Sequence, residues 1–383
     1  MSWEHYKLND ICKSISDGDH QPPPKAENGI PFVTIANITN ANKFDFSNTM
    51  FVPQEYYDKL DDKRRAHVGD ILYSVVGSFG IPVYMSEEQK FVFQRHIAIL
   101  RPDETKVVPQ FLYYTMLSRD FYMKADAVAL GAAQRTVSLT SLRGMDVTVP
   151  DLEMQRKIVD ILKPYDELIE NNQKQIKLLE EAAQRLYKEW FVDLRFPGYE
   201  ETEIVDGIPV GWQELNIDQQ YEIKYGKTLP TSKITDRGKY PVYGASKVIG
   251  YYGEKNVSKR TVLITSRGNA GTVYRTHHND AFVTNNSFIV APKFEELHIP
   301  FIYYQMQELN FKAITTGSCQ PQLTNNSISM KKTILPAERV LKIFNNYTDD
   351  YYERIEKLLN EISLLSEARD RLLPKLMSGE IEV

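Results

Sequence analysis

The sequence predicts an α+β protein in which two related mixed α/β domains are joined by two long helices. We expect these helices to pack as an antiparallel coiled coil with pseudo-two-fold symmetry. Two observations support this fold. Between Pro164 and Phe191 the large apolar residues recur at alternating spacings of four and three, which is typical of a helix paired along its length. The same pattern returns 186 positions later, starting at Tyr351.

The repeated spacing defines a predicted seam on each helix. On the first helix the seam comprises Tyr165, Ile169, Asn172, Ile176, Leu179, Ala183, Leu186 and Trp190. On the second it comprises Tyr351, Ile355, Leu358, Ile362, Leu365, Arg369, Leu372 and Leu376. The same offset relates Pro150 to Pro336 and Gly131 to Gly317, so the chain is a tandem duplication whose two copies each end in a long helix.

The duplication divides the chain into domains and helical regions. The predicted segments are a first domain at 1–150, a first long-helix region at 151–191, a linker at 192–211, a second domain at 212–336, a second long-helix region at 337–379 and a tail at 380–383. Within the domains, short β-type runs alternate with Gly, Pro and Asn clusters, and a helix opens near a proline at Pro109 and again at Pro300. Pro164 marks a position where a helix would start or kink, and the tail is expected to form a short strand.

Composition indicates a soluble globular protein. The chain has 383 residues, 42% of them apolar and 25% charged. No apolar run is long enough to cross a membrane and the first residues do not resemble a signal peptide, so we expect a cytoplasmic protein. The two cysteines, Cys12 and Cys319, are not equivalent under the repeat, and two are too few for a disulfide framework or a zinc site.

Charge is distributed unevenly along the chain. The net charge of −5 argues mildly against nucleic acid, and residues 1–150 hold 16 basic against 18 acidic residues. Between Val210 and Leu335, however, 15 lysines and arginines face 9 acidic residues. A DNA-binding second domain is compatible with this local excess of positive charge.

One set of residues in the first domain could support catalysis. Glycine-rich nucleotide loops are absent from the sequence, and its histidines lack partners at metal-ligand spacing. Asp70, Glu88 and Lys90 could hold a metal ion and activate water in a nuclease. The alternative is a turn entering a strand followed by a charged surface loop, and the second copy lacks the set.

Candidate DNA-binding residues lie in the loops, beside glycines. Gln and Asn side chains suit adenine edges, Arg suits guanine edges, and Lys suits phosphates. Loops of this composition are also ordinary turns, so the assignment rests on their recurrence in both copies. In the first domain the candidates are His20, Gln21, Arg95, His96, Gln134 and Arg135. In the second domain they are Lys227, Lys247, Arg267, Asn269, Asn286, Gln320 and Gln322.

The paired helices suggest a spacer between two DNA-reading domains. From Pro164 to Trp190 a helix would extend roughly 40 Å at 1.5 Å per residue. That length corresponds to roughly 12 base pairs, which suits two half-sites about one turn apart. The alternative is that the helix pair only connects the two domains and does not set a distance between half-sites.

Several short motifs resemble those of the specificity subunits of type I restriction-modification systems. The resemblance covers essentially the whole chain. It is carried by Arg195-Phe196-Pro197 and Ile208-Pro209-x-Gly211-Trp212 in the linker, by Pro150-x-Leu-x-x-Gln155-x-x-Ile158, and by Leu372-Leu373-x-x-Leu376-x-x-Gly379. Asp17-Gly-Asp-His-x-Pro-Pro23 and Tyr240-Pro-Val-Tyr-Gly244 resemble the openings of two recurrent types of recognition domain.

The resemblance implies a non-catalytic subunit with two target-recognition domains, each reading half of a split DNA site. It also implies that the helices set the gap and dock two methyltransferase subunits, which motor–nuclease restriction subunits join. S-adenosylmethionine, ATP and Mg would belong to those partners, and no cofactor or metal to this chain. Candidate docking residues, on helix faces away from the seam, are Glu170, Lys174, Lys177, Glu181 and Arg185. The rival hypotheses are the nuclease described above and an assembly scaffold that does not bind DNA.

Overall fold

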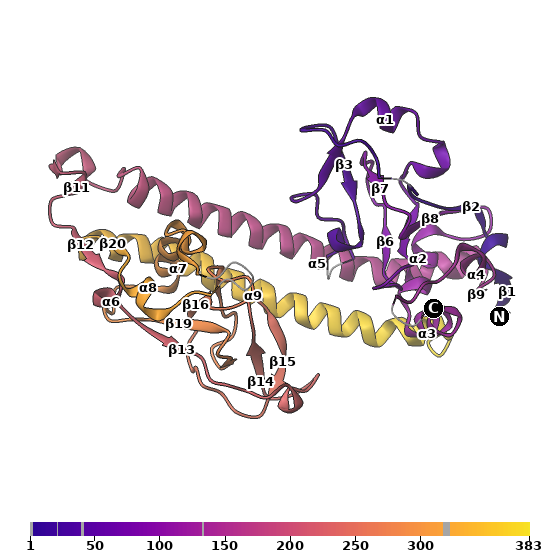
Figure 1. The fold of residues 1–383 in the computed structure, drawn as a ribbon. Coiled ribbons are helices and arrows are strands. Elements are labelled where there is room, and N and C mark those ends of the chain that lie inside the picture. The colour runs from indigo at the N-terminus through magenta and orange to yellow at the C-terminus, as the bar shows by residue number, and fades with distance from the viewer. Residues whose placement is uncertain (1–2, 21, 40–41, 132–133, 317–321) are drawn as a thin grey trace. The chain divides into compact units, whose positions relative to one another are not determined.

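The fold is that of a computed structural model of the chain, which describes residues 3–20, 22–39, 42–131, 134–316 and 322–383. Contacts divide it into two compact units (Figure 1). Unit 1 comprises Met1–Glu170 with Ser363–Val383, and unit 2 comprises Asn171–Ile362. In the described part of the chain, no helix is sufficiently long and apolar to span a membrane.

Unit 1 is built on a four-stranded antiparallel sheet of order β2-β8-β5-β6. A three-stranded sheet of order β4-β3-β7 and the antiparallel pair β1-β9 complete its strands. These strands are β1 (Glu4–Lys7), β2 (Cys12–Asp17), β3 (Ile30–Val33), β4 (Met50–Val52), β5 (Ile71–Ser74), β6 (Pro82–Tyr84), β7 (Val92–Phe93), β8 (Ile97–Pro102) and β9 (Asp146–Val149). Buried strands such as β5 carry continuous apolar runs because both of their faces are covered.

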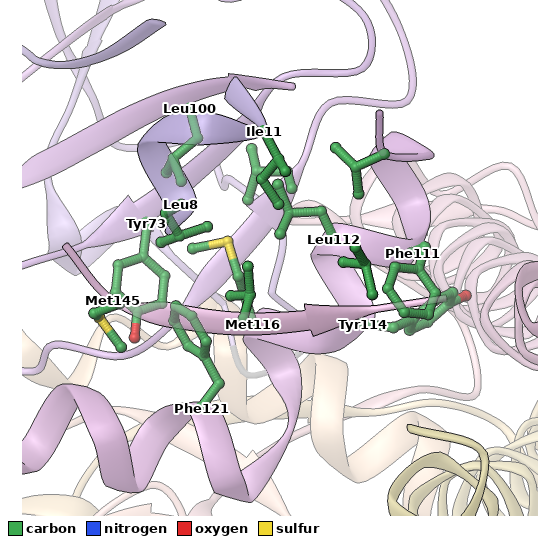
Figure 2. Close-up of a cluster of buried hydrophobic side chains, with 14 of the residues drawn as sticks. Leu8, Ile11, Tyr73, Leu100, Phe111, Leu112, Tyr114, Met116, Phe121 and Met145 are labelled. Carbon is green, nitrogen blue, oxygen red and sulfur yellow. The ribbon is translucent and has the colours of Figure 1, made fainter. Parts of the chain in front are cut away.

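Helices close the core of unit 1. They include α1 (Gln54–Asp58), α2 (Pro109–Leu117), α3 (Arg119–Val128) and α4 (Leu139–Arg143), with 3-10 turns at η1 (Leu8–Asp10), η2 (Ile35–Asn37) and η3 (Asp62–Arg64). As predicted, α2 begins at Pro109, where the missing N–H costs nothing. Figure 2 shows part of the buried cluster, in which Tyr73 and Phe121 meet edge to face at 5.8 Å between ring centroids.

Unit 2 repeats this architecture. Its sheets have the orders β13-β19-β16-β17, β15-β14-β18 and β12-β20. The strands are β12 (Gln213–Asn216), β13 (Tyr221–Tyr225), β14 (Tyr240–Tyr243), β15 (Val248–Tyr252), β16 (Val262–Thr265), β17 (Val273–Arg275), β18 (Phe282–Val283), β19 (Ser287–Pro292) and β20 (Lys332–Leu335). The helices are α6 (Ile217–Gln220), α7 (Ile299–Glu308) and α8 (Asn325–Ser329), with 3-10 turns at η6 (Thr231–Lys233) and η7 (Phe311–Ile314). The predicted duplication is therefore confirmed strand for strand.

The two copies differ mainly in two connections. Residues 34–49 link β3 to β4, whereas residues 244–247 suffice between β14 and β15. Residues 53–70 link β4 to β5 and include α1 and η3, whereas residues 253–261 make the equivalent connection. Both longer segments flank the strand pair β3-β4, so the first domain is enlarged on one side while its four-stranded sheet is unchanged.

The long helices extend further than the seam alone predicted. Helix α5 runs from Leu152 to Tyr187 and continues as a π-helical turn, η4 (Lys188–Val192), while α9 runs from Glu338 to Met377. Pro164 neither starts nor ends α5 but lies inside it, so of the two expectations for this proline the helix start is wrong. The tail forms no strand in residues 380–383, although Ile381 and Val383 pack against the core of unit 1.

The seam is confirmed by burial, because every one of its predicted residues is buried or half-buried. Within unit 2, Trp190 contacts Phe344 and Tyr347, whereas Glu180 lies opposite Tyr352 across a shared arginine. Residue numbers thus rise along α5 as they fall along α9, which confirms antiparallel pairing. Within unit 1, Asp166 of α5 pairs with Arg369 of α9 at 2.7 Å.

The linker ends in an aromatic contact. It contains η5 (Tyr199–Glu201) and a short antiparallel pair, β10 (Ile204–Val205) and β11 (Ile208–Pro209). Phe196 and Trp212 are both buried, with ring centroids 4.8 Å apart. The contact joins Phe196, near the start of the linker, to Trp212, the first residue of the second domain. It thus fixes where the second domain begins.

A buried arginine connects the second domain to both helices. Arg275 of β17 is only 7% exposed, donates to Glu180 of α5 at 2.7 Å and to the Tyr352 hydroxyl of α9 at 3.0 Å, and lies over the Tyr303 and Tyr352 rings. The guanidinium replaces the water it lost on burial with a carboxylate, a hydroxyl and two π faces.

Replacing Arg275 with alanine should destabilise unit 2 by about 2 kcal/mol, because Glu180 and Tyr352 lose their shared donor. We expect a matching fall in the urea midpoint. Arg237→Ala is the matched control, since Arg237 is exposed on the same domain and should change stability by less than about 0.5 kcal/mol. Equal effects of the two variants would show that Arg275 contributes no anchoring.

Candidate nucleic-acid interface

One edge of the four-stranded sheet in unit 1 collects loops from distant parts of the chain. We call residues 17–20, 75–81, 94–96 and 134–137 the first edge. Backbone hydrogen bonds hold them together: Asp19 donates to Phe93 at 2.9 Å, Val75 to His96 at 2.9 Å and Val137 to Val75 at 2.8 Å. The loop backbones are therefore fixed by the sheet, while their side chains are available for recognition.

Unit 2 has an equivalent edge, formed by residues 225–228, 243–247, 266–271, 284–287 and 322–323. We call it the second edge. Lys227 donates its backbone N–H to Val283 at 3.0 Å, Ser266 to Asn286 at 2.8 Å and Leu323 to Ser266 at 3.0 Å. These bonds match those of the first edge one for one. The isolated bridges also correspond, with Asp19–Gln94 and Val76–Thr136 matching Lys227–Thr284 and Arg267–Gln322.

The described candidate DNA-binding residues fall on these two edges. His20, Arg95, His96, Gln134 and Arg135 lie on the first edge, and Lys227, Lys247, Arg267, Asn269, Asn286 and Gln322 lie on the second. Gln21 and Gln320 lie outside the described residues. Each fold thus gathers its candidates, although which of them contact DNA stays a prediction.

Basic residues on the edges differ in whether they have ionic partners. Lys227, Lys247 and Arg267 are exposed, and none of them has an ion-pair partner among the described residues. Within the same part of the chain, Arg95 is likewise exposed and without an ion pair. Arg135, in contrast, pairs with Asp126 and lies 5.5 Å above the centroid of the Phe79 ring.

The acidic residues of the first edge orient its donors. The Asp17 carboxylate lies 2.8 Å from His20 Nε2. Asp19, which is 9% exposed, accepts a hydrogen bond from the Tyr56 hydroxyl at 2.8 Å and lies 3.6 Å from Arg64. Burial, followed by this contact with Asp19, raises the pKa of Tyr56 to about 12, so the hydroxyl stays protonated and donating.

Tyr56 and Arg64 were missed by the sequence analysis. Both belong to the longer connection 53–70, which has no counterpart of equal length in the second copy, so the repeat gave no signal for them. Tyr274 was also missed; its hydroxyl donates to the Gly244 carbonyl at 2.5 Å and lies 2.6 Å from Ser287 Oγ. A tyrosine on a strand facing a glycine turn could have suggested this link.

The three residues of the nuclease hypothesis have different environments. Asp70 is 2% exposed and its carboxylate accepts from Arg101 Nε at 3.1 Å and from the His67 N–H at 2.9 Å. Glu88 and Lys90 are exposed. Within the described ranges, no three His, Cys, Asp or Glu residues are grouped so that they could hold a metal ion. Asp70 is the ion-pair partner of Arg101 at the turn that precedes β5.

The candidate docking residues lie on α5 outside the seam. Lys174, Lys177 and Arg185 are exposed, whereas Glu170 and Glu181 are half-buried. Glu170 lies 3.3 Å from Lys43, and Glu181 lies 3.7 Å from Arg185. Their role in docking stays a prediction.

Comparison with known families identifies the fold. The model of the "Type I restriction modification DNA specificity domain" family matches residues 1–181 and 209–364, so that one match covers each copy of the repeat. The chain belongs to this family.

Relatives in this family extend along the whole chain. The specificity subunit of the type I restriction enzyme HindI from Haemophilus influenzae is 24% identical, covering 99% of both chains. A putative MjaX specificity subunit from Methanocaldococcus jannaschii is 25% identical, covering 100% of this chain and 94% of its own. The crystal structure of a type I S subunit from M. genitalium shares the fold, with a TM-score of 0.58 at 18% identity over 98% of this chain and 96% of its own.

Two glycines in the loop 266–271 of this specificity domain allow a test of how rigidly the second edge is held. Gly268 and Gly271 both have positive φ angles, of 74° and 84°. A Cβ at Gly268 would meet no atom within 4 Å, whereas at Gly271 it would lie 2.7 Å from the Lys312 nitrogen. Gly268→Ala should cost about 1 kcal/mol of backbone strain, and Gly271→Ala about 1–3 kcal/mol more. Thermal unfolding of both variants measures the difference, and equal shifts would mean that the loop moves away from η7 without cost.

Proposed function

We propose that this chain is the DNA sequence-specificity subunit of a type I restriction-modification complex, with each edge reading one half of a bipartite target. The observation that carries the proposal is the recurrence of one loop framework with different side chains. A fixed framework with divergent side chains suits two readers of different sequences.

The side chains on the edges supply the chemistry of base and phosphate recognition. Arg267 and Arg95 can donate bidentately to a guanine edge, and Asn269, Asn286 and Gln322 can pair with adenine edges. Lys227 and Lys247 can neutralise phosphates, which positions the duplex without reading its sequence.

The remaining functions of such a complex would lie on the helices and on partner subunits. We propose that the paired helices α5 and α9 set the gap between the half-sites and dock two methyltransferase subunits, which restriction subunits join. Methylation with S-adenosylmethionine and ATP-driven cleavage with Mg would occur on those partners, while this chain recognises DNA and supplies no catalytic group or cofactor. Because its target is cellular or incoming DNA, we place its action in the cytoplasm.

Arg267→Ala should relax base preference in one half-site, and Arg95→Ala in the other. Loss of a bidentate base contact costs about 1–3 kcal/mol, which corresponds to about 5- to 150-fold in affinity at the contacted base pair. Selection from random duplexes by the assembled methyltransferase complex would reveal each half-site separately. Lys332→Ala, on strand β20 away from the edge, should leave both preferences unchanged.

Relaxation of both halves by a single variant would contradict two independent readers. If the unsubstituted complex selected no sequence at all, the rival hypothesis would hold. The chain would then be an assembly scaffold that does not bind DNA.

Lys227→Gln and Lys247→Gln should weaken binding to all sequences alike. Each lost phosphate contact removes about 0.9 from the slope of log K against log salt concentration. Titrations of specific and scrambled duplexes between low and moderate salt measure this slope. A change in base preference with an unchanged slope would assign these lysines to base reading.

A further inference from the structure

One charged position on the two edges has opposite signs in the two copies. Asp19 forms the isolated bridge of unit 1 that corresponds to the bridge of Lys227 in unit 2, so the two residues are equivalent. The lysine is exposed, whereas the aspartate is buried. The first edge therefore has a carboxylate at the position where the second edge has a candidate phosphate contact.

A cation reaches this position from another part of unit 1. Arg64 Nη1, in η3, lies 3.6 Å from Asp19 Oδ1, while the Tyr56 hydroxyl donates to Asp19 Oδ2 at 2.8 Å. A separation of 3.6 Å is too long for a hydrogen bond. The contact therefore orients the guanidinium and leaves the N–H donors of Nη1 for another acceptor. The Arg64 side chain is 37% exposed, so a ligand can reach it.

Lys63 adds a second cation beside Arg64. It is exposed and has no ion-pair partner in the part of the chain that the structure describes. The Lys63 carbonyl accepts from Ser16 Oγ at 2.5 Å, which attaches η3 to the end of β2 that leads into the first edge. The Lys63 N–H donates to the Asp61 carboxylate at 3.1 Å. Two adjacent positive charges thus lie beside the first edge.

Arg101 of β8 holds η3 on the sheet. Its Nη2 donates to the carbonyl oxygens of Asp62 at 3.2 Å and of Arg65 at 2.9 Å, at either end of the turn. Its Nη1 donates to the Asp62 carboxylate at 2.5 Å. None of the three residues of η3 is buried, so these bonds do not serve to close the hydrophobic core. They fix the backbone that carries Lys63 and Arg64.

The second copy lacks this clamp. Thr261 stands where unit 1 has Asp70, the second carboxylate that Arg101 contacts. Ala291 stands where unit 1 has Arg101, as the pairing of β5 with β8 and of β16 with β19 shows. The connection 253–261, all of which the structure describes, contains no turn equivalent to η3. The cations of η3, the clamp that holds them and the reversed charge on the edge therefore occur together, in the first copy alone.

We propose that Lys63 and Arg64 contact the DNA backbone in the first half-site, in place of the lysine at the equivalent position of the second edge. This inference rests on the proposed function and adds two contacts from a segment that was not duplicated. Phosphates suit these residues better than bases do, because a phosphate oxygen accepts from a point charge or a single N–H, whereas a guanine edge requires the whole guanidinium fork. Asp19, Tyr56 and Arg101 are positioning residues, since they act through Arg64 and η3.

The test is the salt dependence of DNA binding by the assembled methyltransferase complex, measured with the duplex that the unsubstituted complex selects from random sequences. Lys63→Gln should lower the slope of log K against log salt concentration by about 0.9, because one phosphate contact is lost. Lys13→Gln is the matched control. Lys13 is exposed at the opposite end of β2 from the first edge and should leave the slope unchanged. Base preference should be the same in every variant.

Arg64 requires a control for its buried partner, since Arg64→Gln alone leaves the Asp19 carboxylate without a cation and lowers stability. The double variant Asp19→Asn/Arg64→Gln has the same net charge as the unsubstituted chain, and the asparagine oxygen can still accept from the Tyr56 hydroxyl. We expect this double variant to recover the unfolding temperature but not the slope, which should stay about 0.9 lower. Arg64→Lys should keep most of the slope because it keeps the positive charge.

Three results would overturn the inference. An unchanged slope in Lys63→Gln would show that η3 lies away from the duplex. Recovery of the slope in the double variant would show that Arg64 only neutralises Asp19. A changed base preference with an unchanged slope would assign these residues to base reading. Failure of the unsubstituted complex to bind any duplex would instead refute the proposed function itself.

Discussion

Neither repeat closes its hydrophobic core with its own residues alone. The core of unit 1 contains Leu162 from the helix of the first copy together with Leu373 and Leu376 from the helix of the second. The core of unit 2 contains Tyr187 from the first helix and Phe344 from the second. Each domain therefore requires the start of its own helix and the end of the other. Only antiparallel helices can meet that requirement twice, so core burial dictates the direction of the pair.

The exposed side chains of the two sheet edges are not needed to join the loops to one another. On both edges the loops are joined by main-chain hydrogen bonds, such as Val75 to His96 and Ser266 to Asn286, which any residue except proline can form. Glycines take the conformations with positive φ at Gly77, Gly80, Gly268 and Gly271. The exposed side chains between them can change without altering the framework, which is why loops of almost unrelated sequence have the same hydrogen-bond pattern.

The sequence allowed prediction of whatever depends on periodicity or on recurrence. The seam from Tyr165 to Trp190 follows from spacing, and the gathering of Arg95 and Gln134 follows from their places between strands. A helix start at Pro164 was wrongly expected because a proline inside a long helix is tolerated where packing on both sides holds the helix together. Nothing local in the sequence could show that Arg135 is paired with Asp126 while Arg267 has no such partner in the described chain, since ion pairing depends on three-dimensional neighbours.

The contacts between domain and helices that could not be predicted are made by different residues in the two copies. Tyr114 and Tyr304 are equivalent residues of α2 and α7, and each contacts the helix position that the repeat relates, Asp166 in one case and Tyr352 in the other. The tyrosine is the same in both copies, while its partner is a carboxylate in unit 1 and a phenol in unit 2. In unit 2 the negative charge is supplied instead by Glu180, and Arg275 enters from the domain to neutralise it, whereas in unit 1 Arg369 of α9 neutralises Asp166. The duplicated chain thus retained the charge balance at each junction of domain and helices but met it with different residues. Burial of Arg275 and partial burial of Arg369 favour a carboxylate beside each guanidinium, and that requirement fixes the balance without fixing which element provides each charge.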